Sequence, residues 1–261
     1  MKIQIARDAR PQVRTLLMAA ALAVALWFIP FAEILTYPFR IFVTFIHEGG
    51  HALAALLTGN EVHSLSVSMN GSGEVYSRNG GLLSQLFVSS AGYLGAMSFG
   101  ALLLLLIRRA FAARMVLVGS AALILVLTVV YGVFSPLMHG SMFSPFTLVA
   151  GAALFVGLVA VARYSTPRVA AFLVSFLAVQ CVLNALFDLK TVLFLSTPFA
   201  PGVQTDAVNM ADATGIPAFF WALVWIGLAF LILSMTLRAY AVSKGSPNQQ
   251  DLPFEDSPLE V

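Results

Sequence analysis

The chain has 261 residues, of which 59% are apolar and only 10% are charged. A soluble domain has a charged fraction of about a quarter, and a mean hydropathy of +0.91 is far above what a soluble core requires. We therefore expect a polytopic integral membrane protein. The formal net charge is only +2 and the basic residues are dispersed, which argues against nucleic-acid binding. The single cysteine, Cys181, excludes an intrachain disulfide.

The N-terminal part of the chain predicts a cytoplasmic segment followed by a first membrane span. Four basic side chains lie within residues 1–14, and an apolar run begins at Thr15. This pattern is similar to a signal peptide, but the run continues to about Pro38 without a clear cleavage site. We therefore predict a first span that is retained.

The rest of the chain predicts an all-α membrane domain. After a segment at 41–57, further apolar runs follow at 82–107, 115–134, 146–162, 169–195 and 217–237. Most approach or exceed the ~20 residues that a bilayer requires of a helix. We expect about six transmembrane helices plus one helix that carries a metal site, all within a single domain over 15–238. The polar, proline-containing residues 239–261 are predicted to form a disordered cytoplasmic tail.

Residues 60–80 are a polar interruption with the pattern of a β-hairpin. Leu65, Val67 and Met69 alternate with serines, and Asn70-Gly71 follows. Alternation that ends in Asn-Gly is a strong hairpin signal. The alternative is an ordinary surface loop.

The distribution of Lys and Arg predicts how this hairpin is placed. The connections 135–145 and 196–216 contain neither residue and are expected to face out, which puts both termini in the cytoplasm. With both termini on one side, the number of membrane crossings must be even. Seven apolar segments would give an odd number, unless residues 41–80 enter the membrane and return on the same side. Irregular backbone at this depth is tolerated only inside protein or beside a hydrated cavity. The pattern therefore indicates a membrane-embedded hairpin and an internal hydrated site.

The chemical signal of the sequence is His47-Glu48-Gly49-Gly50-His51, an H-E-x-x-H motif. On a helix the two histidines lie on one face, where both can bind Zn²⁺ while Glu48 lies beside a metal-bound water. The alternative is a pair of histidines held by hydrogen bonds inside a helical bundle. Two imidazoles and a carboxylate within one apolar segment are costly unless they are paired, coordinated or hydrated, which favours the metal.

A third protein ligand is needed, with a fourth position left open for water. The candidates are Glu33, Glu61, His63, Glu74, His139, Asp188, Asp206 and Asp212. Asp188 and His47 each lie about eight residues from the predicted outer end of their segments, or ~12 Å in depth. Asp188 is therefore the preferred ligand and Asp206 the alternative, which could instead cap the helix that follows. Asn184, one turn before Asp188, could orient the ligand or bind a substrate carbonyl, or it could serve helix packing alone.

These residues resemble the site-2-protease-like zinc intramembrane metallopeptidases, particularly their small bacterial branch. The matching stretches lie between residues 40 and 230: His47–Gly59, Ser89–Gly100, Asn184 to Asp188, and Thr205–Pro217. The resemblance implies zinc held by His47, His51 and Asp188, with Glu48 as the general base. It also implies a hairpin near residues 62–76 that presents a strand edge to an unwound substrate.

The sequence thus predicts a zinc-dependent endopeptidase that hydrolyses a peptide bond in or near a transmembrane segment of another membrane protein. The alternative is a non-proteolytic transporter or assembly factor that retains a structural metal site, since ionisable residues inside the membrane also mark ion pathways. The charge bias and the resemblance suit a bacterial inner membrane, with the lipid bilayer and a membrane-protein substrate as partners.

Overall fold

The computed structural model describes residues 10–26, 28–78, 80–108, 112–197 and 203–241. Within these ranges the chain is mostly helical and carries one small antiparallel sheet. The elements are α1 (Arg10–Leu26), α2 (Ala32–Leu57), β1 (Val62–Val67), β2 (Gly73–Ser77), α3 (Leu82–Arg108), α4 (Ala113–Val126), the π-helix η2 (Leu127–Phe134), α5 (Ser135–Met138), α6 (Pro145–Tyr164), α7 (Pro167–Leu195), α8 (Asp206–Thr214) and α9 (Ala218–Ala241).

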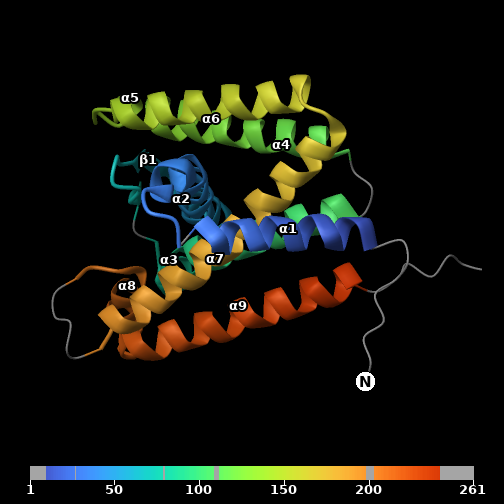
Figure 1. Cartoon of the computed structure of the whole chain (residues 1–261). Coiled ribbons are helices and arrows are strands. Elements are labelled where there is room, and N and C mark those ends of the chain that lie inside the picture. Colours follow the sequence, from blue (N-terminus) through green and yellow to red (C-terminus); the bar gives the residue numbers. More distant parts are fainter. Residues whose placement is uncertain (1–9, 27, 79, 109–111, 198–202, 242–261) are drawn as a thin grey trace, which may run out of the picture.

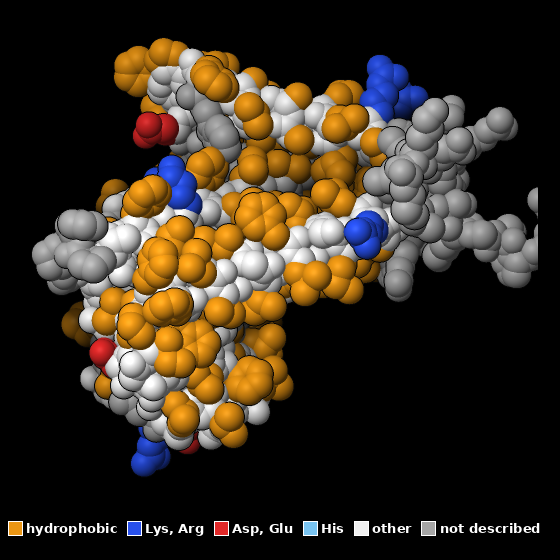
Figure 2. All heavy atoms as spheres, turned by 90° about the horizontal axis from the view of Figure 1, so that it is seen from below, with side chains coloured by type: hydrophobic (Ala, Val, Ile, Leu, Met, Phe, Trp, Pro, Cys, Tyr) orange, Lys and Arg blue, Asp and Glu red, His pale blue; other side chains and the backbone are white. Residues whose placement is uncertain are grey.

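Five helical stretches in the described part of the chain are long and apolar enough to cross a membrane. They are Leu82–Ile107, Ala113–Met138, Pro145–Tyr164, Pro167–Leu195 and Ala218–Tyr240. Figure 2 shows one outer face on which hydrophobic side chains predominate and only a few charged ones intervene. An apolar exterior of this kind suits lipid rather than water. The expected helical membrane protein is confirmed in this coarser form.

The first predicted span differs from the structure. Helix α1 begins at Arg10, inside the expected N-terminal segment, and ends at Leu26, and its apolar part is shorter than those of the five spans. Helix α2 then begins at Ala32, after Phe31 takes a left-handed backbone conformation with φ of 62°. The expected run to Pro38 was wrong, because Pro38 lies inside α2. Of the expected tail, residues 239–241 end α9, and residues 242–261 lie outside the described part.

The predicted hairpin is confirmed as β1 and β2. Their antiparallel register pairs Leu65 with Val75 and Val67 with Gly73. Near its open end, Val62 pairs with Ser77 and Ser64 with Tyr76, so His63 is an extra, bulged residue. Strict alternation would place Val62 and Leu65 on opposite faces, and the bulge allows both to be buried.

Side chains from the first turns of α5 and α6 cover the outer edge of β1. The hydroxyl of buried Thr147 accepts a hydrogen bond from Val67 N at 2.8 Å and donates to Val67 O at 3.1 Å. The Ser135 hydroxyl donates to Val62 O. These bonds satisfy strand groups that a third strand would otherwise occupy. Strand β2 remains as the edge strand of the sheet.

The helices pack around α3, which contacts α2, α7, α8 and α9. In Figure 1, α4 and α6 lie side by side on one side of the molecule and α9 lies on the other, with α7 crossing obliquely between them. Close crossings depend on small residues: Gly50 of α2 lies against the Ala91 backbone, and a Cβ at Gly100 would lie 2.9 Å from Ala178 O on α7. Both glycines therefore permit the helix contacts expected of small residues in membrane bundles.

The short helix α8 lies between α7 and α9 in sequence and packs on α3 and α9. Thr205 caps it, with its hydroxyl accepting from Val208 N, and Gly215 ends it in a left-handed conformation with φ of 74°. Asp206 therefore occupies the first helical position, and the capping role considered for it belongs to Thr205. Helix α3 packs on both α8 and α2, and α2 bears the two histidines. Asp206 is thereby brought close to them.

Candidate metal centre

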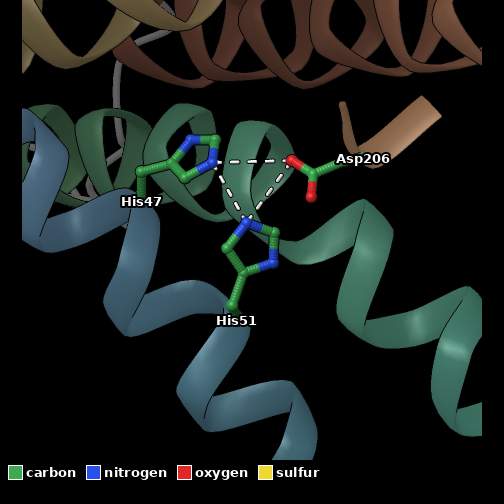
Figure 3. Close-up of side chains that lie close together, drawn as sticks. All are labelled: His47, His51 and Asp206. Atoms are coloured by element: carbon green, nitrogen blue, oxygen red, sulfur yellow. Dashed lines mark hydrogen bonds and ion pairs between the residues drawn. The ribbon is translucent and has the colours of Figure 1, made fainter. Parts of the chain in front are cut away.

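The two motif histidines point toward one another from successive turns of α2. Their Nε2 atoms lie 3.1 Å apart, and their rings meet at 71° with centroids 4.8 Å apart. Figure 3 shows both rings directed at a common point, where the carboxylate of Asp206 also lies. The helical spacing of four residues produces this convergence, as the motif predicts.

Asp206 supplies the third oxygen or nitrogen donor of this cluster. Its Oδ2 lies 3.7 Å from His47 Nε2 and 3.5 Å from His51 Nε2. Burial opposes ionisation of the carboxyl group, but the positive charge that His51 carries when it is protonated and holds no metal outweighs it, with His47 close by, so the pKa of Asp206 lies below its ordinary value. Its position in the first turn of α8 also favours the anion. Asp206 is thus held as a carboxylate at the two imidazoles.

The donor geometry fits a zinc ion. In a tetrahedral site with Zn–N and Zn–O bonds of about 2.0–2.1 Å, neighbouring donor atoms lie about 3.3 Å apart. The three donor separations given above bracket that value. Two imidazoles and one carboxylate also form a donor set that is usual for catalytic zinc, with a fourth position free. Among the described residues, His47, His51 and Asp206 are one of two groups whose donors lie this close.

The backbone of α3 fixes the orientation of His51. Its Nδ1 lies 2.6 Å from the carbonyl oxygen of Val88. A carbonyl can only accept, so Nδ1 carries the proton and donates, which leaves the lone pair on Nε2 for a metal. His51 is 6% exposed, so this bond also satisfies a polar atom that water would not reach.

Two residues of α3 close the centre on one side. A Cβ added to Gly92 would meet both His47 and His51 at their Nε2 atoms, so only glycine leaves the rings in place. The Tyr93 ring packs edge-on against His47 at 4.7 Å, and its hydroxyl interacts with Asp206. Tyr93 also contacts Trp225 of α9, whose indole N–H donates to Ser90 at 3.0 Å. This chain of contacts ties α9 to the metal centre.

Glu48 lies between the two histidines in sequence and against the hairpin in space. It is 4% exposed, and its carboxyl group packs so closely on Gly73 that a Cβ there would overlap it. Glycine at this position of β2 thus leaves room for the glutamate. The carboxylate and the hairpin therefore occupy the same side of the site.

An open cleft of about 960 Å³ joins the metal centre to the hairpin and α7. His47, Glu48, His51 and Asp206 line it together with residues 70–75 of the turn and of β2. On the α7 side the lining includes Asn184 and Asp188, and α2 contributes Arg40. The cleft is open and its lining includes many polar side chains, which is the kind of surface that water can occupy.

In the structure Asp206, and not Asp188, lies beside the two histidines. Asp188 lines the cleft but does not join His47 and His51 within ligand distance, whereas Asp206 does. Asp188 lines the same cleft as His47, but an estimate of depth along a helix does not determine toward which neighbour a helix face turns. The sequence also contained no sign that α8 packs on α3. The alternative ligand weighed from sequence is therefore the one that the geometry supports.

Asn184 lies on the cleft wall, but its amide group donates to the Gln180 carbonyl at 2.8 Å and to the Gln180 side chain at 3.3 Å. Sequence reasoning missed Tyr93 and Gly92, although both lie within the stretch Ser89–Gly100 that carries the family resemblance. Of the other candidate ligands, Glu61, His63 and His139 gather in a separate group.

The comparisons with known proteins agree with this centre. A family model described as Peptidase M50B-like matches residues 16–236, which is most of the chain, and the protein belongs to that family. The match supports a membrane-embedded metalloprotease. No curated protein and no solved structure matches the chain.

Proposed function

We propose that the protein is a zinc-dependent intramembrane endopeptidase that hydrolyses a peptide bond in or near a transmembrane segment of another protein. The observation that carries this proposal is the convergence of His47 Nε2, His51 Nε2 and Asp206 Oδ2 within 3.1–3.7 Å. Membership of the M50B-like family supports the same chemistry independently of the geometry.

In this proposal His47, His51 and Asp206 hold the metal, with Asp206 in the place first expected of Asp188. A zinc ion bound there supplies a Lewis acid and lowers the pKa of water toward ~7. Val88 holds His51 in the tautomer that ligation requires, and Tyr93 supports the Asp206 carboxylate. All three residues line the cleft, so a metal held there would be open to water and substrate.

Glu48 acts as the general base. It follows His47 on α2 and lines the same cleft, with its carboxyl group against Gly73. In the proposed reaction Glu48 accepts a proton from the attacking water and delivers it to the leaving amide nitrogen. The surrounding structure positions Glu48: the hairpin confines its side chain on one side, and α2 sets its distance from the histidines.

The hairpin suits the binding of an unwound substrate. Thr147 and Ser135 cover the outer edge of β1, so β2 is the strand on the side of the cleft, which residues 73–75 line. An extended peptide can add to such an edge by backbone hydrogen bonds, which exposes its amides and fixes its register. We assign Asn184, on the α7 wall, to contact the substrate backbone. A substrate lying there would pass beside Glu48.

The test uses Glu48→Gln in native membranes. We expect the variant to retain zinc and to lose proteolysis, because glutamine keeps the shape of the side chain but cannot accept the proton. The readout is mass spectrometry of new protein termini within membrane spans, compared between wild type, Glu48→Gln and the control Glu33→Gln, which changes an exposed glutamate of α2. Equal sets of new termini in wild type and Glu48→Gln would contradict the proposal and favour a non-proteolytic membrane protein.

A further inference from the structure

A second cluster of metal-binding side chains lies at the open end of the hairpin, whereas Glu48 contacts Gly73 near the turn. Glu61 precedes β1, His63 is the bulged residue of β1, and His139 ends α5. Each offers one donor atom, and these atoms all lie within 4.8 Å of one another. From these observations we propose a second zinc site, formed by Glu61, His63 and His139.

The backbone prepares His139 to act as a ligand. Its Nδ1 lies 2.8 Å from the carbonyl oxygen of Ser135, one helical turn earlier. The carbonyl can only accept, so Nδ1 donates and the lone pair lies on Nε2. That Nε2 is the atom directed at the cluster, 3.9 Å from Glu61 Oε2. The arrangement repeats the relationship between His51 and Val88 at the first centre.

The strand bulge prepares His63. Without it, the residues of β1 would alternate strictly between the two faces of the hairpin. The bulge instead leaves His63 outside the pairing of Val62 with Ser77 and Ser64 with Tyr76. Its ring stacks on His139, with centroids 4.0 Å apart and planes inclined by 16°. A bulge is a common means of redirecting one side chain at a functional site.

Stacked imidazoles do not yet present both lone pairs to one ion, because each lone pair lies in its ring plane. Binding therefore requires one ring to turn out of the stack. The side chains of His139 and Glu61 are 32% and 71% exposed, so this movement meets little packing resistance. Two nitrogens and one carboxylate oxygen suit zinc, with water completing the coordination.

The site would join two parts of the fold. Glu61 and His63 belong to the hairpin, whereas His139 follows η2 and α5, and the Ser135 hydroxyl already reaches Val62 O between them. A metal ion here holds β1 against the end of this helix pair. Because β2 lines the catalytic cleft, occupancy would reduce the mobility of the strand that we propose receives substrate.

The experiment uses full-length protein in detergent, purified without a polyhistidine tag, stripped with chelator and titrated with Zn²⁺. In a His47→Ala/His51→Ala background we expect about one zinc per chain to remain. It should be lost on adding His63→Gln or His139→Gln and weakened by Glu61→Gln, whereas the control Glu33→Gln should not change it. In the wild-type background His139→Gln should lower the stoichiometry from about two to one, which covers the case in which the double variant does not fold.

Hydrogen exchange provides a second measurement. Zinc added to the His47→Ala/His51→Ala protein should slow amide exchange over residues 62–77, and His139→Gln should abolish that effect. A wild-type stoichiometry of one that His139→Gln leaves unchanged would overturn the second site. The second site would also be overturned if the His47→Ala and His51→Ala changes removed all bound zinc while changes at His63 and His139 removed none. Conversely, zinc bound only through His63 and His139 would support this site while contradicting the proposed catalytic centre.

Discussion

The Cα of Gly92 faces the Nε2 atoms of His47 and His51 so closely that no side chain fits between them. Helix α3 thereby forms a wall behind the metal-binding nitrogens, while Val88, one turn earlier, accepts the hydrogen bond of His51. A single helix thus limits where both imidazoles can move and selects the tautomer of one of them. Metal affinity should therefore depend on residues of α3 that bind no metal.

Gly92→Ala tests this wall. We expect zinc affinity to fall about tenfold or more, as for other changes that disturb the support of metal ligands, because the added methyl group displaces both rings. The measurement is competition with a chromophoric chelator. Gly227→Ala is the matched control, since it also places alanine in a helix but meets open space. Equal affinities of the two variants would show that α3 does not position the rings.

Tyr93→Phe separates the hydroxyl group from the ring. The ring contact with His47 remains, but the interaction with Asp206 is lost. We expect a weaker hold on zinc and slower proteolysis with little change in thermal stability. Tyr164→Phe, which changes an exposed tyrosine of α6, should leave both properties unaltered. If Tyr93→Phe keeps wild-type zinc affinity and proteolysis, the Tyr93 hydroxyl does not support the metal centre.

Thr147→Val tests how the hairpin is held. The valine cannot satisfy Val67 N and Val67 O, and leaving buried polar groups unpaired costs about 1–3 kcal/mol. We expect lower thermal stability and faster amide exchange over β1 and β2. The control Thr236→Val removes a hydroxyl that bonds only within its own helix, to Ile232 O at 2.7 Å. Unchanged exchange in the hairpin of Thr147→Val would show that other contacts secure β1.

Patterns that are local in sequence predicted their part of the fold well. The H-E-x-x-H spacing fixed the mutual position of His47 and His51, and alternation ending in Asn70-Gly71 predicted the hairpin. In each case the distance between the interacting groups follows from a helical or strand period.

The features that sequence patterns could not determine depend on contacts between distant segments. Hydropathy cannot show that a helix stops within an apolar run, as α1 does at Leu26 before Phe31 turns the chain. Choosing Asp206 over Asp188 required knowing that α8 packs on α3. Likewise, the stacking of His63 on His139 could not be predicted, because the bulge at His63 arises only when β1 pairs with β2.

The most direct test of the catalytic centre compares Asp206→Asn with Asp188→Asn. Both changes remove one carboxylate from the same cleft, but Asp206 alone of the two lies within ligand distance of the histidines. The measurement is zinc content after dialysis against a weak chelator, in a His63→Gln/His139→Gln background so that only the first centre is counted. We predict that Asp206→Asn loses the metal and Asp188→Asn keeps about one zinc per chain. Retention by Asp206→Asn together with loss by Asp188→Asn would contradict the account.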